Sequence, residues 1–506
     1  MKSNCDRNMG QTMGTPSGVE RRTLLRGALT GAGLLILSPG GKALAQENDK
    51  SESGASPLAL ALAQALNRPK FADLSPTPIK YAKMLLASTL ASAAPGALID
   101  SARIIRDLCK EEGGRPDATV WFDGAKLPIP SAARANAVAS AAAASDDSDL
   151  RNIAHTGTTL TAVGLAIAER TGATGPDILS AMVLGYESAG RIGDALAGGR
   201  PGLHASLIVA FGGVVAAARL LGLTDQQMAN AIGITATTMG GLGIGTNSWA
   251  REYHDGNASL CAVNAALAAG RGYTVNKDML EARGGFLTVF GDGKIDRQKF
   301  IRDAGPDWDL VKYMAVKLVP GAHAYQASAE AAVNAARQAG VPAEEIAQIL
   351  VAGPQSRAVV GRQRPPADMV EAIHSLPYFL ASAVADKDFS WVHTSPEKIH
   401  SQAAVRLMGL VAQDPAPPPV HYDWSWGSTV TVVTQSGARF TSTVLAPKAS
   451  GPRGIEWSDV DAKYMALMPH SGLPLKNIEE ALELIHNFEQ VKHASELTRL
   501  LHGKRA

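Results

Sequence analysis

The chain has 506 residues, of which 46% are hydrophobic, 19% charged and only 5% aromatic. That apolar fraction excludes intrinsic disorder as the main state, and the length suggests about three domains or roughly two large ones. The 48 basic and 47 acidic residues leave a net charge of +1. The chain as a whole therefore has no electrostatic reason to bind nucleic acid or an anionic membrane.

Residues 1–45 have the order of a secretory signal rather than of a folded segment. Arg21-Arg22-Thr23-Leu24-Leu25-Arg26 is followed by an apolar stretch and by the small residues Ala43-Leu44-Ala45. The paired arginines are typical of a twin-arginine signal, and the apolar run is shorter than the roughly 20 residues that a membrane span needs. We expect cleavage after Ala45, export to a bacterial periplasm and no membrane anchor on the mature chain. A retained segment and a cytoplasmic enzyme are the alternatives.

Residues 46–56 are polar and without periodicity, which predicts a flexible leader. Three cysteines are too few for a disulfide framework, and Cys5 leaves with the signal. For Cys109 and Cys261 we expect two unpaired buried thiols, although the sequence alone leaves a bond between them open.

Residues 57–312 carry a helical apolar pattern. Gly222 is placed to end one helix, and Thr224-Asp225-Gln226-Gln227 is a capping box for the next. Many alanines allow close approach of helix backbones. The segments with the clearest pattern are Thr158–Arg170, Asp177–Leu196 and Leu207–Leu221.

The pattern changes near residue 313. A helix over Ala327–Gln338 and a strand over Gln348–Ala352 precede the proline-rich loop 414–420, and 429–445 predicts a hairpin with its turn at Ser436-Gly437. Residues 451–506 return to helix, with a capping box at Ser458-Asp459-Val460-Asp461 and an amphipathic stretch over 475–501. The prediction is a mainly α fold in which a large discontinuous helical domain, 57–312 and 451–506, is interrupted by a smaller α+β domain, 313–450.

Common cofactor motifs give weak signals. The run Gly240-Gly241-Leu242-Gly243-Ile244-Gly245 follows no strand and lacks a nearby lysine or ribose-binding acid, so a tight turn explains it better than a nucleotide loop. The isolated cysteines and scattered histidines show no spacing for zinc or an iron–sulfur cluster.

A series of cationic or proton-transferring residues lies within apolar, small-residue sequence. Each one alone is more readily explained as a hydrogen-bonded structural residue. If they converge, they form a positive pocket suited to a small polycarboxylate, because each buried carboxylate needs a cation or several donors. The residues are His155, His204, Arg251, His254, Lys317, His323, His374 and Tyr378.

Several stretches, in this order, give the chain a resemblance to the MmgE/PrpD family, which includes 2-methylcitrate dehydratase, cis-aconitate decarboxylase and iminodisuccinate epimerase. The resemblance runs from about Pro57 to the end of the chain. The stretches are Asp146–Gly157, Ala173–Leu196, Leu203–Gly222, Arg251–Ala258, Gly284–Phe286, Lys317–His323 and His374–Tyr378.

The resemblance implies a helical domain with an α+β lid, usually as a homodimer, and lyase chemistry without metal or cofactor. It places the catalytic positions on Asp147, His155, His204, Lys317 and Tyr378. It places the substrate-binding positions on Ser148, Arg251, His254 and His323.

Two departures from the family pattern point to a changed substrate or reduced activity. The acidic loop of the family begins with a His and, three residues on, an Asp, where this chain has Ala141 and Ala144. A family lysine is replaced by Arg251, which keeps the charge but does not act as an acid near neutral pH.

The resulting hypothesis is dehydration of a 2-methylcitrate-like hydroxy acid by proton abstraction and elimination. His155 is the first candidate for the general base or acid, Lys317, Arg251 and His204 hold carboxylates and developing charge, and Tyr378 donates a hydrogen bond or a proton. Decarboxylation or epimerisation of a related polycarboxylate is the alternative within the family. A periplasmic carboxylate-binding protein that has lost catalysis is the alternative from another class.

Overall fold

The structure, a computed structural model, describes residues 55–196, 202–361, 364–422 and 426–502. The predicted signal and nearly all of the predicted leader lie outside these residues. The described residues from Ser56 onward form one compact unit. A mainly helical fold is confirmed, whereas the predicted domain boundaries and the lid stay predictions.

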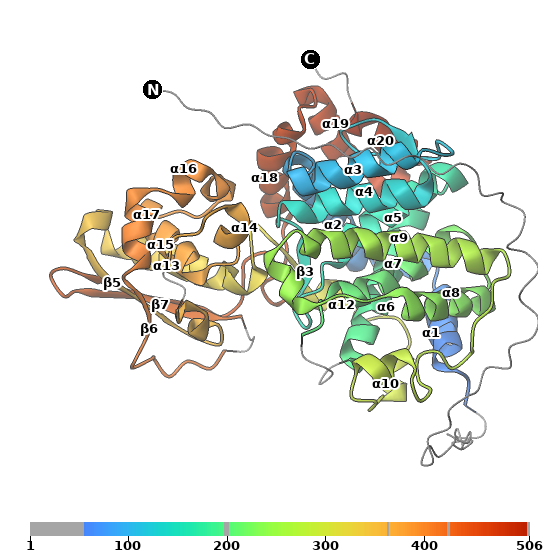
Figure 1. Ribbon diagram of the computed structural model, residues 1–506, viewed down its shortest axis with the longest axis horizontal. Coiled ribbons are helices and arrows are strands. Elements are labelled where there is room, and N and C mark those ends of the chain that lie inside the picture. The colour runs from blue at the N-terminus through green and yellow to red at the C-terminus, as the bar shows by residue number, and fades with distance from the viewer. Residues whose placement is uncertain (1–54, 197–201, 362–363, 423–425, 503–506) are drawn as a thin grey trace, which may run out of the picture. The chain divides into compact units, whose positions relative to one another are not determined.

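A first hydrophobic core takes its buried side chains from Leu58–Val316 and again from Ala449–Leu501. Figure 1 shows the long helices of this core, blue to green, side by side, with the red helices α18 and α19 against α2. The longer helices are α1 (Leu58–Asn67), α2 (Pro76–Gly96), α3 (Asp100–Glu112), α4 (Ile129–Ala142), α5 (Thr156–Thr171), α6 (Gly175–Ala195), α7 (Ser206–Leu220), α8 (Asp225–Thr238), α9 (Ala250–Gly270), α18 (Trp457–Leu467) and α19 (Leu475–His486). The short ones are α10 (Phe286–Phe290), α11 (Arg297–Phe300), α12 (Asp309–Tyr313) and α20 (Ser495–Thr498).

Small residues let the helices of this core touch backbone to backbone, as the alanine-rich sequence predicts. A Cβ on Gly185 of α6 would lie 2.7 Å from the carbonyl oxygen of Gly212 in α7, closer than real Cβ atoms come to any neighbour. The apolar helix α7 is therefore buried on all sides, with Leu207, Phe211 and Val214 in the core.

A second hydrophobic core takes its side chains from Ala327–Val444. Its four-stranded sheet has the order β6-β5-β7-β8, parallel between β6 and β5 and antiparallel elsewhere, and α13 packs against β7 and β8. The strands are β5 (Ile346–Ala352), β6 (Val411–Gln413), β7 (Ser428–Thr434) and β8 (Arg439–Val444). The helices are α13 (Gln326–Ala339), α14 (Met369–Ala372), α15 (Leu376–Asp386), α16 (Pro396–Ile399) and α17 (Gln402–Met408).

Two short antiparallel pairs complete the strands. β1 (Ala118–Thr119) pairs with β2 (Lys126–Leu127), and β3 (Asp147–Asp149) pairs with β4 (Met314–Val316). The second pair matters for function, because it joins segments more than 160 residues apart in the sequence and sets Asp147 opposite Val316.

The helix caps predicted from the sequence are confirmed in part. Thr224 caps α8 in a capping box with Gln227, and Gly222 follows α7 with φ of 64°. The box predicted at Ser458 is wrong: α18 begins at Trp457, Glu456 makes no side-chain cap, and the Trp457 ring lies 3.9 Å from that of His486. The helix therefore starts two residues earlier than the cap signal predicts.

The predicted amphipathic stretch 475–501 is not one helix, because α19 ends at His486. The chain then turns to pack on the start of α6, where the Gly175 amide donates to the Val491 carbonyl. Cys109 and Cys261 are free thiols, as expected, but only Cys109 is buried.

Among the described residues, no single helix is long and apolar enough to cross a membrane. Only the pair α2 and α3, bent by 94° to each other, meets the requirements of length and composition.

Candidate functional site

The β3–β4 pair brings Asp146 and Lys317 together in a buried ion pair. The backbone amide of Lys317 donates to the Asp146 carbonyl at 3.2 Å, and its ammonium contacts the Asp146 carboxylate. Burial opposes ionisation of Asp146, but the charges of His155 and Lys317 outweigh it and lower its pKa to about 2. Asp146 is therefore ionised at neutral pH.

His155 lies at the start of α5 beside this ion pair. Its Nδ1–H donates to the Asp147 carbonyl at 2.7 Å, 3.6 Å from the Asp146 carboxylate and 3.3 Å from the Ser148 hydroxyl. Burial lowers the pKa of His155 to about 4, although Asp146 opposes the shift. Because a carbonyl only accepts, the proton of the neutral ring is on Nδ1 and Nε2 keeps its lone pair.

His204 has the opposite tautomer. The Ser206 amide donates to its Nδ1 at 3.2 Å, so the proton of the neutral ring is on Nε2. Burial, with the charges of His155 and His254, lowers its pKa to about 3. The His254 ring lies 5.0 Å away, and burial lowers the pKa of His254 as well.

The glycine run borders these two histidines. It leaves α8 and enters a 3-10 helix over Gly243–Asn247, not a strand-to-helix loop. A Cβ at Gly241 would lie 3.3 Å from the His204 Cβ, and one at Gly245 3.2 Å from His254 Nε2. The absence of side chains on these glycines leaves space for the two imidazole rings. The prediction of a tight turn did not include this role.

Arg251 on α9 binds the end of α4. Its guanidinium donates to the carbonyls of Ala141 and Ala142 at 3.0 and 3.2 Å and lies 3.5 Å from Glu252. Its Nε has no partner among the described residues. Arg251 therefore combines a structural contact with an unpaired N–H donor. The term histidine cluster denotes His155, His204 and His254 with Asp146, Lys317 and Arg251.

His323 and His374 come from the segments around the second core. His323 is buried with its ring 5.4 Å from that of Trp426, and neither ring nitrogen has a partner among the described residues. His374 Nδ1 donates to the Val370 carbonyl at 2.9 Å, and burial and the Arg251 charge lower its pKa to about 4. His374 also lines a cavity of about 320 Å³ with Asn247 and Arg364.

Tyr378 is not part of this cluster. Its hydroxyl donates to the His393 carbonyl at 2.5 Å within the second core, and burial raises its pKa to about 12. A role in proton donation requires breaking this bond, so the structure gives no contact that supports the role predicted from the sequence.

Asp147 is buried behind the ion pair rather than in it. Its Oδ1 accepts from the Gly157 amide at 2.9 Å, and its Oδ2 has no partner among the described residues. Burial and the neighbouring Asp146 charge raise its pKa to about 8, so Asp147 is mainly a neutral acid at pH 7.

The cluster is less positive than the sequence predicts, because its histidines are uncharged near neutral pH. Lys317 and Arg251 supply the cationic charge, and Asp146 and Glu252 offset part of it. Among the described residues, no group of three or more His, Cys, Asp or Glu side chains is arranged to hold a metal ion.

Comparison with known families now decides the identity of the chain. The family model of the MmgE/PrpD N-terminal domain matches residues 60–298, and that of the MmgE/PrpD C-terminal domain matches residues 320–486. The chain belongs to the MmgE/PrpD family. Human cis-aconitate decarboxylase is 24% identical over 459 residues, which cover 87% of this chain and 94% of that protein.

Fungal members of the MmgE/PrpD family match shorter parts of the chain, with higher sequence identity than the human protein. Cis-aconitate decarboxylase of Aspergillus terreus is 34% identical over 126 residues, 24% of this chain and 26% of that protein. A cis-aconitate decarboxylase-like protein of Aspergillus oryzae is 33% identical over 136 residues, 25% of this chain and 28% of that protein.

Sequence reasoning about this MmgE/PrpD chain missed three buried residues beside the cluster. Asp146 was passed over for its neighbour Asp147. Lys463 donates to the Ser88 hydroxyl at 2.7 Å and to the Ser145 carbonyl, and burial lowers its pKa to about 7. Asp255 has no partner among the described residues for either carboxyl oxygen, and burial raises its pKa well above the usual range.

One of the three had a signal in the sequence. Lys463 shares the apolar face of α18 with Val460 and Leu467, and a lysine on such a face is expected to be buried with a partner. The acidic pair and Asp255 offered no comparable signal.

Proposed function

We propose that this chain is a lyase acting on a small di- or tricarboxylate, with decarboxylation of a cis-aconitate-like substrate as the first reaction to test. Family membership and the cis-aconitate decarboxylases among its relatives support a carboxylate lyase. The geometry adds two cations, Lys317 and Arg251, that suit the carboxylates of such a substrate.

The observation that carries the proposal is the pair of neutral histidines with opposite tautomers. His155 offers an Nε2 lone pair that can accept a proton, and His204 offers an Nε2–H that can donate one. A site that offers both a base and an acid suits reactions that make and quench a carbanion next to a carboxylate.

In the decarboxylation, the bond between a carboxylate and its carbon breaks and CO₂ leaves. The electron pair stays on that carbon, where a conjugated carboxylate held by Lys317 or Arg251 stabilises it. A proton from an acid such as His204 Nε2–H then completes the product. Each turnover consumes one proton from solvent: His155 Nε2 takes up this proton and returns it to His204, which restores both neutral rings.

Dehydration of a 2-methylcitrate-like acid stays a second candidate. In this reaction the His155 Nε2 lone pair removes a proton from carbon, and the departing hydroxyl takes the proton of His204 Nε2–H. The same cluster serves both reactions, so the substrate decides between them.

A panel of di- and tricarboxylates, including cis-aconitate and 2-methylcitrate, followed by proton NMR with the purified mature chain, tests the proposal. We expect turnover of at least one member and its loss in His155→Ala. His421→Ala, at an exposed histidine outside the cluster, is the matched control and should keep full activity.

The rival is a carboxylate-binding protein without catalysis, for which Ala141 and Ala144 are the supporting residues. Saturable binding of panel members without conversion of any favours that rival over the lyase.

We also propose export and assembly as predicted from the sequence: removal of residues 1–45, a periplasmic location, a homodimer, and an α+β part that acts as a lid. Amino-terminal sequencing of the protein from its host tests the cleavage, and an intact start would contradict it. Light scattering tests the dimer, and a monomeric mass would contradict it.

A further inference from the structure

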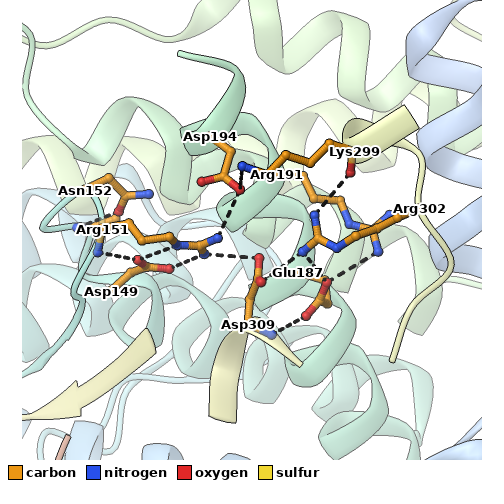
Figure 2. Close-up of polar contacts among 10 residues, drawn as sticks. Asp149, Arg151, Asn152, Glu187, Arg191, Asp194, Lys299, Arg302 and Asp309 are labelled. Carbon is orange, nitrogen blue, oxygen red and sulfur yellow. Dashed lines mark hydrogen bonds and ion pairs between the residues drawn. The ribbon is translucent and has the colours of Figure 1, made fainter. Parts of the chain in front are cut away.

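A second group of charged side chains gathers on the first core. Figure 2 shows acidic and basic residues from the β3 loop, α6 and the segment around α11 and α12 in one network. Arg151 contacts Asp149, Asp194 and Asp309, while Arg302 contacts Glu187 and Asp309.

A cavity of about 230 Å³ opens on this network. Four cations and two carboxylates line it: Arg191, Lys294, Lys299, Arg302, Asp194 and Asp296. The exposed fraction of these side chains falls from 88% for Lys294 through 59% for Lys299 and 30% for Arg302 to 0% for Arg191. The cavity therefore has lysines at its mouth and a buried guanidinium at its floor.

Both lining carboxylates already have partners. Asp194 is held by Arg151 and Lys299, each at 3.3 Å, and Asp296 accepts from the Lys299 backbone amide as the cap of α11. Asp194 is thus already paired with two cations, whereas Asp296 accepts only from a backbone amide.

Arg191 is the residue left short of partners. One contact, to Glu187 at 3.3 Å, serves its Nη2, while its Nε and Nη1 have no partner among the described residues. A guanidinium carries five N–H donors, and leaving several of them buried and unpaired costs free energy. Burial and the nearby Asp309 charge also raise the pKa of Glu187, which weakens the counter-charge to Arg191 near neutral pH.

We propose that this cavity binds a small oxyanion, with Lys299 and Arg302 contacting it directly and Arg191 supplying charge from the floor. A tetrahedral or planar anion with two or more oxygens matches this set, because guanidinium groups bind such oxygens in pairs and ammonium groups bind them singly. None of the residues that line the cavity is one of the predicted lyase residues, so the proposal does not depend on the proposed lyase activity.

Two sources offer this chemistry: a free inorganic anion such as phosphate, and the carboxylate groups of a small organic acid such as citrate. Calorimetric titration of the full mature chain with inorganic phosphate and with citrate, at constant ionic strength, distinguishes them. The anion that binds more tightly identifies the source, and the variants described next show whether it binds in this cavity.

Variants at the exposed side of the cavity separate it from the histidine cluster. Lys299→Gln and Arg302→Gln should each weaken binding of the tighter anion at least about tenfold, the usual worth of one charge-assisted hydrogen bond. Lys476→Gln, which removes an exposed charge elsewhere, should leave binding unchanged. A circular dichroism melt of each variant confirms that it is folded.

The proposal is overturned if neither anion binds saturably at millimolar concentration. It is also overturned if Lys299→Gln and Arg302→Gln bind like the wild type, or if Arg251→Gln alone abolishes binding, because the anion then occupies the histidine cluster.

Discussion

Lys317 and Asp146 form a buried ion pair across two short strands, with side-chain exposures of 3% and 2%. The pair links the end of β4 to the residue before β3, and His155 lies 3.6 Å from the same carboxylate. The same ion pair thus links β3 to β4 and places charged groups next to His155.

Replacing the Asp146 carboxylate should lower the free energy of unfolding substantially. Asp146→Asn leaves Lys317 buried without a counter-charge, which typically costs about 3–5 kcal/mol of unfolding free energy. Urea denaturation measures this loss. Glu480→Gln, which breaks the exposed pair with Lys476, is the control and should cost less than about 0.5 kcal/mol. Equal losses in the two variants would mean that the buried pair has no special role.

His155 should stay uncharged well below its ordinary titration range. Its pKa in the folded chain is about 4, against an unperturbed value of 6.5. Between these pH values the unfolded chain therefore binds a proton that the folded chain does not bind. Above pH 6.5 this group therefore does not lower the free energy of unfolding. As the pH falls toward 4, it lowers that free energy by about 3 kcal/mol in total.

Nitrogen NMR of the imidazoles measures this directly. The wild type should show an Nδ1–H tautomer for His155 at pH 5.5, and the stability difference between wild type and His155→Gln should shrink as the pH is lowered from 6.5. Titration of His155 near pH 6.5 would show that it is not buried as described.

Much of the fold followed from sequence pattern, whereas the site did so only in part. The helix over α7, the hairpin β7–β8 and the cap at Thr224 rest on local rules of periodicity and hydrogen bonding, and these were predicted. Tyr378 has the residue type and neighbours of a site residue, but its hydroxyl is used inside the second core.

The choice between Asp146 and Asp147 could not come from the sequence. Neighbouring residues on a strand point to opposite sides, and which side faces Lys317 depends on the register between β3 and β4, which is set by segments more than 160 residues apart.

Tyr378→Phe tests the reassignment of that residue. The change removes one buried hydrogen bond, so we expect a loss of about 1–3 kcal/mol of stability and turnover within about threefold of the wild type. Steady-state kinetics alongside thermal melts gives both values. Turnover that collapses while stability holds would restore Tyr378 to the catalytic set.

Ala144 occupies a left-handed backbone conformation, with φ of 49°, where a Cβ is strained. Ala144→Gly should raise the unfolding free energy by about 0.5–1 kcal/mol. In the control Ala61→Gly, inside α1, the same change should lower it by a similar amount. Calorimetry of the two variants compares them, and destabilisation by both would argue against strain at Ala144.

The central claim is that the histidine cluster turns over a small polycarboxylate. Incubation of the purified mature chain with carboxyl-labelled ¹³C cis-aconitate, followed by carbon NMR, tests it most directly. We predict release of labelled CO₂ with a decarboxylated product, and none of either from His155→Ala. Labelled cis-aconitate that binds but stays unchanged, together with unchanged 2-methylcitrate in a parallel sample, would contradict the account.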